Sequence, residues 1–519
     1  MNAKRPKYPI GIQSFEKLRM NDYLYIDKTK LIYQLVNTSD YVFLSRPRRF
    51  GKSLLLSTLE AYFLGRKDLF EGLDIYDLER DWVEYPVLHM SLTGVDYNDA
   101  SVRWDVINNY LESWEREYGE SDAVSIGVRF RNVIEKASAR HGHPVVILID
   151  EYDKPLIDVM HDPSLLEQIR RELEGFYSAL KNCDRFIRFA CLSGITKFGH
   201  VSIFSGLNNL KDISLMPAYN TICGISESEF QEYFADTLQD FAGENGMTSE
   251  EARSLIRKYY DGYHFARSGE GIYNPFSVLN AFDSGYLRPY WFKSGTPSHL
   301  IDFLRNHDAE IPALEGAVRN SSELEDLTNL ERDVVPLLYQ SGYLTIKNWD
   351  SATDRYTLGF PNREVSEGFW TLLAESMLFF KGGASYDTGK FTAALMAGDP
   401  ERFLLLVKSL FAGIPSAHEP VKEIHFHVMM AVLTKMLGLQ VGIEVASGRG
   451  RSDMEVFTPQ YVYIFEFKVD ESAQSALAQI RERGYADPYA SDPRCKYLIG
   501  VEFSSRERTL ADWIVERNG

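Results

Sequence analysis

The stretch Gly448–Asp470 constrains the fold of this chain most, because it reads as two strands that carry acidic residues at facing positions. A turn at Thr458–Tyr461 places Asp453 directly opposite Glu466 in an antiparallel hairpin. Two carboxylates that face each other destabilise a sheet unless a cation lies between them. The hairpin therefore predicts a site for Mg²⁺ or Mn²⁺, which prefer oxygen ligands.

Lys468 follows Glu466 by two residues, so both side chains leave the same face of the strand. A metal at such a site polarises a phosphodiester and acidifies a water, while the lysine orients that water or offsets charge at the phosphate. A hairpin whose charges simply face water is the alternative. It is disfavoured here because the two charges interrupt the apolar run Tyr461–Val469, which is typical of a buried strand.

A second charged motif lies nearer the start of the chain, where residues 46–53 read RPRRFGKS. Tyr41–Leu44 before it has the pattern of a buried strand, and the apolar residues after it begin a helix. In such a strand, loop and helix arrangement, loop amides and the helix N-terminus surround a triphosphate. Lys52 is then expected on the β and γ phosphates of ATP or GTP, and the Ser53 hydroxyl on Mg²⁺.

The other residues of this motif refine the prediction. Arg48, Arg49 and Gly51 are expected to contact the nucleotide together with Lys52. Arg46 occupies the place of the first glycine of a phosphate loop, which narrows the backbone conformations open to the loop. This departure favours nucleotide binding over hydrolysis. An ordinary helix start is the alternative, because Lys and Ser also begin helices that bind no ligand.

Two later apolar runs support a nucleotide site. Residues 143–149 have the pattern of a strand buried on both faces of a parallel sheet, and Asp150 and Glu151 follow them directly. Asp150 is expected to hold the Mg²⁺ shell, and Glu151 to polarise the attacking water. The next run ends in Ser193 and Thr196, either of which is expected to sense the γ-phosphate. For each residue taken singly, a turn residue that closes a strand is the favoured interpretation.

Together these motifs resemble the bacterial AAA-ATPase-like proteins, which commonly carry a PD-(D/E)XK nuclease module at the C-terminus. The resemblance rests on YPIGIQSF at residues 8–15, on RPRRFGKS, and on the strand end IDEYD at residues 149–153. It also rests on the order helix, strands, helix, strand in roughly the last hundred residues. The resemblance implies a P-loop regulatory domain fused to a nuclease domain.

The resemblance also assigns residues by position in the C-terminal part. The facing carboxylates of the hairpin are similar to the metal ligands of the superfamily, and Lys468 is similar to its motif lysine. Glu423 matches the helix-borne acid, with Glu444 as the alternative. Gln479 matches the auxiliary residue of the helix after the hairpin.

Composition limits the class of protein. The chain has 519 residues, 45% apolar side chains, four scattered cysteines and a net charge of −18. This length favours roughly two to four domains, and no apolar run of about 18 residues is present to span a bilayer. Sparse cysteines and the lack of an apolar signal segment indicate the cytoplasm. The acidic charge argues against a protein that coats DNA through general electrostatics, so a nuclease would need local basic residues to bind its substrate. Arg449 and Arg451 are candidates, with a solvated turn as the alternative.

The region between the two sites is predicted to be mostly helical. Helical spacing is present at residues 227–241, 249–260 and 330–339, and a hairpin with a turn at residues 348–354 follows. Helices plus a hairpin suggest a winged-helix-like unit. We expect it to be a lid or packing module, and DNA binding is the alternative.

The predicted fold is α/β with three parts. A P-loop AAA-ATPase-like domain with a parallel sheet is expected at residues 1–215, the helical or winged-helix-like unit at 216–384, and a PD-(D/E)XK domain at 385–519. The expected function is nucleotide-regulated, Mg²⁺-dependent hydrolysis of DNA, in defence against foreign DNA. The alternative is an ATP-binding switch or scaffold that binds nucleic acid or a partner without cutting. The oligomeric state stays open.

Overall fold

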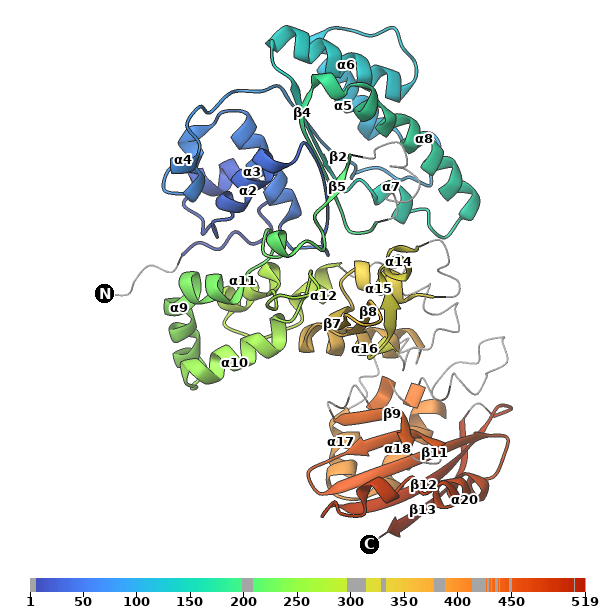
Figure 1. Cartoon of the computed structure of the whole chain (residues 1–519). Coiled ribbons are helices and arrows are strands. Elements are labelled where there is room, and N and C mark those ends of the chain that lie inside the picture. The colour runs from blue at the N-terminus through green and yellow to red at the C-terminus, as the bar shows by residue number, and fades with distance from the viewer. Residues whose placement is uncertain are drawn as a thin grey trace. The chain divides into compact units, whose positions relative to one another are not determined.

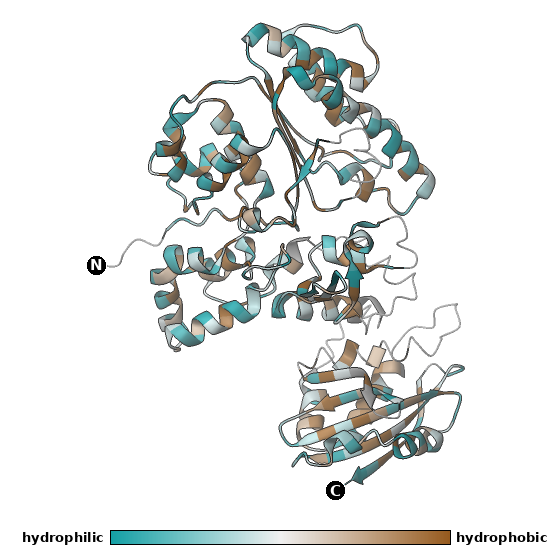
Figure 2. Cartoon of the chain, viewed as in Figure 1, coloured by the Kyte–Doolittle hydropathy of each residue, from teal (hydrophilic) through white to brown (hydrophobic). Residues whose placement is uncertain are grey.

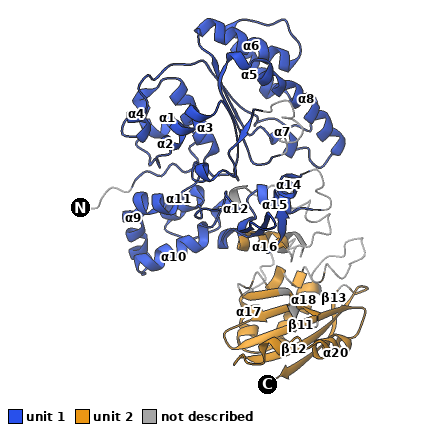
Figure 3. Cartoon of the chain, viewed as in Figure 1, with its two compact units in different colours: residues 1–295, 316–365 blue, residues 296–315, 366–519 orange. Residues whose placement is uncertain are grey.

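The chain folds as two compact units, which Figures 1 and 3 show: residues 1–295 with 316–365 form unit 1, and residues 296–315 with 366–519 form unit 2. The structure is a computed structural model. It describes residues 6–197, 209–295, 314–327, 333–377, 388–412, 426, 429–430, 432–434, 437, 439–447, 450–507 and 509–518. Each unit is best understood by itself.

Unit 1 starts with a five-stranded sheet of order β2-β3-β4-β1-β5, in which all pairings are parallel. Its elements in chain order are α1 (Phe15–Met20), α2 (Thr29–Thr38), β1 (Tyr41–Ser45), α3 (Lys52–Phe63), η1 (Lys67–Phe70), α4 (Asp74–Leu78), β2 (Val87–Ser91), α5 (Asp105–Tyr118), α6 (Ile126–His141), β3 (Val145–Asp150), α7 (Lys154–Ile157), α8 (Pro163–Asn182), η2 (Asp184–Phe186), β4 (Ile187–Gly194) and β5 (Lys211–Asp212). The predicted parallel sheet is confirmed.

Helices cover both faces of this sheet. Figure 1 shows α2, α3 and α4 on one side and α5, α6 and α8 on the other. Every residue of β3 is therefore buried, which explains its uninterrupted apolar sequence. Parallel strands end at a common edge, where Ser45 of β1 lies beside Gly194 of β4 and β3 ends at Asp150. The fold thus brings the predicted phosphate loop and Asp150 to the same edge.

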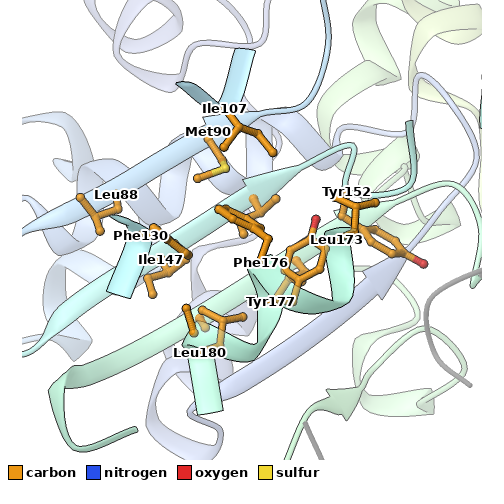
Figure 4. Packing of buried hydrophobic residues seen from close by; sticks show 14 of the residues in the cluster. Leu88, Met90, Ile107, Phe130, Ile147, Tyr152, Leu173, Phe176, Tyr177 and Leu180 are labelled. Atoms are coloured by element: carbon orange, nitrogen blue, oxygen red, sulfur yellow. The ribbon is translucent and has the colours of Figure 1, made fainter. Parts of the chain in front are cut away.

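A hydrophobic core fills the space between the sheet and α5, α6 and α8 (Figure 4). Phe130 of α6 stacks on Phe176 of α8 with ring centroids 4.7 Å apart. Met90 and Ile147 contribute to the same cluster from the strands. Figure 2 shows hydrophobic strands and mostly hydrophilic outward faces on these helices. The amphipathic pattern fixes which face of each helix packs on the sheet, and so holds the strand ends in place.

The rest of unit 1 is helical with a small antiparallel sheet. Its elements are η3 (Pro217–Tyr219), α9 (Glu227–Glu244), α10 (Ser249–Tyr260), α11 (Pro275–Ser284), α12 (Tyr290–Gly295), β6 (Val318–Asn320), α14 (Ser321–Glu325), α15 (Val335–Gln340), β7 (Thr345–Asp350), β8 (Arg355–Gly359) and the start of α16 (Arg363–Met377). The predicted helices at 227–241 and 249–260 are confirmed. A capping box of Ser226 and Glu229 satisfies the first amides of α9 and fixes where it begins.

The predicted hairpin is present within a sheet of order β6-β8-β7. The predicted turn at residues 348–354 is wrong in part, because β7 continues to Asp350. Trp349 pairs with Tyr356 there, and Asp350 pairs with Arg355. An aromatic cross-strand pair stabilises the extended conformation at these positions. The turn therefore occupies residues 351–354.

Unit 2 contains a second five-stranded sheet, of order β13-β12-β11-β10-β9. Its elements after α16 are α17 (Thr388–Met396), α18 (Pro400–Ala412), β9 (Gln440–Ser447), β10 (Gly450–Phe457), β11 (Tyr461–Val469), α20 (Ala473–Arg483), η5 (Asp487–Tyr489), β12 (Cys495–Ser504) and β13 (Thr509–Asn518). Strands β9, β10 and β11 form an antiparallel meander, and α20 connects β11 to β12, which runs parallel to it. The sheet is thus mixed, and the α/β fold class is confirmed in both units.

Within the described part of the chain, no helix combines the length and the apolar character that a bilayer crossing needs.

Candidate functional site

The hairpin of β10 and β11 has the register that the sequence predicts. Met454 pairs with Phe465, and each further pair follows the same spacing through to the turn. One step beyond this ladder lie Asp453 and Glu466. Asp453 Oδ2 accepts a hydrogen bond from the backbone N–H of Phe467 at 2.7 Å, which holds its carboxylate at the adjacent strand. The two carboxylates therefore lie next to each other.

Glu466 is the most constrained group of this site, because its side chain is only 1% exposed. Its Oε1 accepts a hydrogen bond from the Gln479 amide and lies 3.6 Å from Lys468 Nζ. Its Oε2 is buried and has no hydrogen-bond partner among the residues that the structure describes. Burial, and next the charge of Asp453, raise the pKa of Glu466 to about 7.

These groups fit a divalent cation. An orphaned carboxylate oxygen beside a second carboxylate is the environment that a bound cation relieves. Within the described residues, no cluster of three or more His, Cys, Asp or Glu side chains is arranged to hold a metal. The further acid predicted at Glu423 lies outside the described residues, and so does the side chain of its alternative, Glu444. Their assignment stays a prediction.

Mg²⁺ binding at this site is expected to depend on pH, because the cation needs an ionised Glu466 whose pKa is about 7. The proton must leave before the metal binds, so affinity should fall about tenfold for each pH unit below pH ~6 and level off above pH ~8. Calorimetric titration of Mg²⁺ over this range checks the expectation. Glu466→Gln serves as the control, with weak and pH-independent binding. A wild-type Mg²⁺ affinity that stays constant over this pH range would contradict the expectation.

Side chains on α20 and just after it support Glu466. Gln479 lies on this helix, as predicted, and its amide also lies 3.4 Å from the Tyr485 hydroxyl. Tyr485 is buried and approaches β10 so closely that a Cβ at Gly450 would lie 3.0 Å from its oxygen. The sequence interpretation assigned no role to Tyr485. Its spacing six residues after Gln479, just beyond the helix, is the signal that could have indicated it.

The predicted phosphate loop connects β1 to α3 at the carboxyl edge of the first sheet. Gly51 precedes α3 with φ +99°, a left-handed conformation that glycine adopts without strain. Arg49 also has positive φ, at +66°, and so does Glu151 after β3, at +50°. Such conformations cost about 1–2 kcal/mol in a non-glycine residue and concentrate at functional sites. The two strained residues lie on the same pocket.

That pocket is hollow and charged. It has a volume of about 410 Å³ and extends from the N-terminal segment to the start of α11. Its charged and hydroxyl groups are Arg48, Arg49, Lys52, Ser53, Glu151 and Lys154. The pocket thus contains four cationic side chains and one carboxylate, and this excess of positive charge suits a polyphosphate ligand. Lys154 was not predicted, although a lysine three residues after Glu151, in the first turn of α7, is a readable signal.

Lys52 and Ser53 already have partners in this loop. Lys52 is buried, and its Nζ donates to the carbonyl oxygens of Arg46 at 2.9 Å and Pro47 at 3.1 Å. Ser53 Oγ donates to Asp150 Oδ2 at 2.5 Å. Burial lowers the pKa of Lys52, because the desolvated ammonium is destabilised. A bound phosphate would replace the two carbonyls as the partner of the ammonium.

The acids at the end of β3 differ in their surroundings. Asp150 accepts hydrogen bonds from Ser53 and from the Ser193 hydroxyl, so a cation at Ser53 would lie within its reach. Burial, followed by the charge of Asp150, raises the pKa of Glu151. Thr196 is buried and does not line the charged pocket, and its hydroxyl and N–H both donate to Asp153 Oδ2 at 2.6 Å. The structure thus joins Thr196 to Asp153.

Arg46 is a structural group of the loop. Its side chain is 1% exposed, and its guanidinium donates to the carbonyls of Ser214 at 2.8 Å and Tyr219 at 3.1 Å. It also lies 4.2 Å from the centroid of the Phe265 ring. The side chain therefore points away from the pocket and anchors the loop to the following segment of unit 1. Arginine takes the place of a glycine here without filling the phosphate site.

The fold and the two sites define a phosphate-loop unit joined to a nuclease-type α/β unit. Comparison with known proteins agrees with this: residues 9–204 match the family described as predicted AAA-ATPase, and residues 421–513 match the PD-(D/E)XK nuclease superfamily. An uncharacterized protein in the vnfD 5′ region of Azotobacter chroococcum mcd 1 is 38% identical over 527 residues, covering 99% of this chain and 100% of its own.

The chain belongs to this family of predicted AAA-ATPases with a C-terminal PD-(D/E)XK nuclease superfamily domain. The resemblance seen in the sequence is confirmed. The family indicates nucleotide binding for the first domain and nuclease activity for the last.

Proposed function

We propose that the protein is a nucleotide-regulated, metal-dependent nuclease that hydrolyses phosphodiester bonds in DNA, acting in the bacterial cytoplasm in defence against foreign DNA. The observation that carries the proposal is the arrangement around Glu466. Its buried carboxylate lies beside Asp453 and has the Lys468 ammonium 3.6 Å from one oxygen, while the other oxygen has no protein partner in the described part of the chain. The defence role rests on the family resemblance alone.

The residues of the site have separate tasks in this proposal. A divalent cation held by Asp453 and Glu466 would supply Lewis-acid polarisation and an acidified water. Lys468 is partly exposed, so its ammonium can reach a substrate phosphate while it stays close to Glu466. There it offsets developing charge or orients the water. Gln479 fixes the Glu466 carboxylate, so that its second oxygen stays directed to the cation.

The phosphate loop is the control site of the proposed enzyme. Lys52, Arg48 and Arg49 would bind the phosphates of ATP or GTP, and Ser53 and Asp150 would hold the Mg²⁺ that accompanies them. Nucleotide occupancy can change the nuclease only if two conformations of the protein bind the nucleotide with different affinities. The helical part between the two sites is the proposed moving element.

A second candidate function is an ATP-binding switch or scaffold that does not cut nucleic acid. The anchored Arg46 favours a switch, because its hydrogen bonds to the carbonyls of Ser214 and Tyr219 hold the loop in a rigid, binding-competent conformation. The intact set of Asp453, Glu466 and Lys468 favours the nuclease.

A cleavage assay on the full chain tests the proposal. Single-stranded and double-stranded DNA and RNA are incubated with EDTA, Mg²⁺ or Mn²⁺, each with and without ATP. DNA cleavage that needs the metal and responds to ATP supports the nuclease. ATP binding without cleavage of any substrate would leave the switch or scaffold as the better account.

A further inference from the structure

The phosphate loop is held from outside the pocket as well as from within. Inside, Lys52 donates to the carbonyls of Arg46 and Pro47, and a nucleotide would compete for that ammonium. Outside, the indole N–H of Trp291 donates to the carbonyl of Arg48 at 2.9 Å. A bound nucleotide would therefore draw the Lys52 ammonium away from the loop carbonyls but would not contact the Trp291 indole. The indole can keep the loop in place both with and without nucleotide.

Trp291 is suited to fix the loop because its own position is fixed. It is buried on α12, and its ring packs at 63° against Tyr343 with centroids 5.3 Å apart. Gly342 approaches from the same side, since a Cβ there would lie 2.6 Å from Pro47 Cβ and 3.5 Å from Trp291 Cζ2. Close packing of this kind leaves the indole little freedom to move away from the loop.

The backbone of Trp291 is held in turn by Glu364. The backbone N–H of Trp291 donates to Glu364 Oε1 at 2.7 Å, and the Ser277 hydroxyl donates to Oε2 at 2.7 Å. Glu364 is 1% exposed, and its hydrogen-bond partners among the described residues are uncharged. Burying a carboxyl costs free energy that burying an apolar residue does not. The presence of Glu364 at this position therefore needs an explanation.

Glu364 connects the two walls of the nucleotide pocket. Ser277 lies in the first turn of α11, and the neighbouring Phe276 lines the pocket, where its ring lies 5.0 Å from the Arg49 guanidinium. One carboxyl thus joins the loop wall, through Trp291, to the α11 wall. It belongs to the first turn of α16, the helix within which the chain passes from unit 1 to unit 2.

We propose that Trp291 and Glu364 are positioning residues for the phosphate loop, which set its nucleotide affinity from outside the pocket and connect its position to the start of α16. This inference rests on the proposed nucleotide binding. It assigns a role to two residues that do not touch the nucleotide.

Hydrogen exchange and ATP titration on the full chain test the inference. Trp291→Phe keeps an aromatic ring but removes the N–H, and Glu364→Gln keeps the shape of the carboxyl. Each should speed exchange of the loop amides at residues 46–51 without nucleotide, and weaken ATP binding, by about three- to tenfold, the worth of one hydrogen bond. ATP should protect the first turn of α16 in the wild type and lose that effect in both variants. Exchange in β3 should not change.

Trp349→Phe is the matched control, because it also removes an indole hydrogen bond, here to Asp354 at 2.9 Å on the exposed end of β7. It should alter neither loop exchange nor ATP affinity. Unchanged loop exchange in both test variants, or faster exchange throughout unit 1, overturns the inference. Should the wild type bind no ATP, the proposed nucleotide function fails, and loop exchange without nucleotide still decides the positioning role.

Discussion

Asp453→Asn is expected to lower metal-dependent cleavage at least about 10³-fold, because it removes a negative ligand from a cation that contributes several kcal/mol to the transition state. The backbone N–H of Phe467 can still donate to the amide oxygen of the variant, so the hairpin should stay intact. Cleavage rate in Mg²⁺ and thermal unfolding, measured on the same preparation, check both parts of the expectation.

Glu455→Gln is the matched control for this variant. Glu455 is a buried carboxyl two residues further along β10, where Ser452 and Tyr489 donate to its two oxygens. It also carries a carboxyl on β10, but both of its oxygens already have protein partners. The control should retain most of the activity. A wild-type rate in Asp453→Asn would show that the proposed cation site is wrong.

Lys52→Ala is expected to weaken ATP binding by roughly 10- to 100-fold, because each charge-assisted hydrogen bond to phosphate contributes about 1.5–3 kcal/mol. The full chain is titrated with ATP in a calorimeter. Ser53→Ala should weaken mainly the Mg²⁺-dependent part of the affinity, since its hydroxyl lies beside Asp150.

Lys67→Ala provides the control for the loss of a lysine, because Lys67 is exposed on η1 and does not line the nucleotide pocket. The ATP affinity of the Lys67→Ala variant should equal that of the wild type. Thermal unfolding must accompany the Lys52 variant, since its ammonium also satisfies two loop carbonyls. Equal ATP affinity in a folded Lys52→Ala protein would reject a functional phosphate loop.

The sequence predicted the hairpin and the phosphate loop because both depend on local spacing. Side chains alternate along a strand, so a turn position and two residue numbers suffice to place Asp453 beside Glu466. The apolar run of β3 likewise identified a strand buried on both faces. The roles of these residues, and of Glu423 and Gln479, stay predictions until the variants are measured.

Other features depend on partners far apart in the chain. Trp291 and Arg48 are 243 residues apart, and nothing in either neighbourhood of the sequence indicates their contact. Strand β13 also went unpredicted, since an edge strand that is only half buried lacks a clear alternation of apolar residues. Tertiary packing decides such features, and a single sequence carries little signal for it.

The anchoring of Arg46 restricts how this chain can be recombined with a relative. Its buried guanidinium takes two acceptors, the carbonyls of Ser214 and Tyr219, and one aromatic neighbour, Phe265, from residues that follow the last strand of the parallel sheet. A crossover just after that sheet, between diverged genes, would risk leaving this buried cation with the Ser45 carbonyl alone among its present acceptors. Exchanges that keep residues 1–365 together avoid this cost. The phosphate loop and the helices that hold it should therefore be inherited as one segment, while the nuclease part remains free to be replaced.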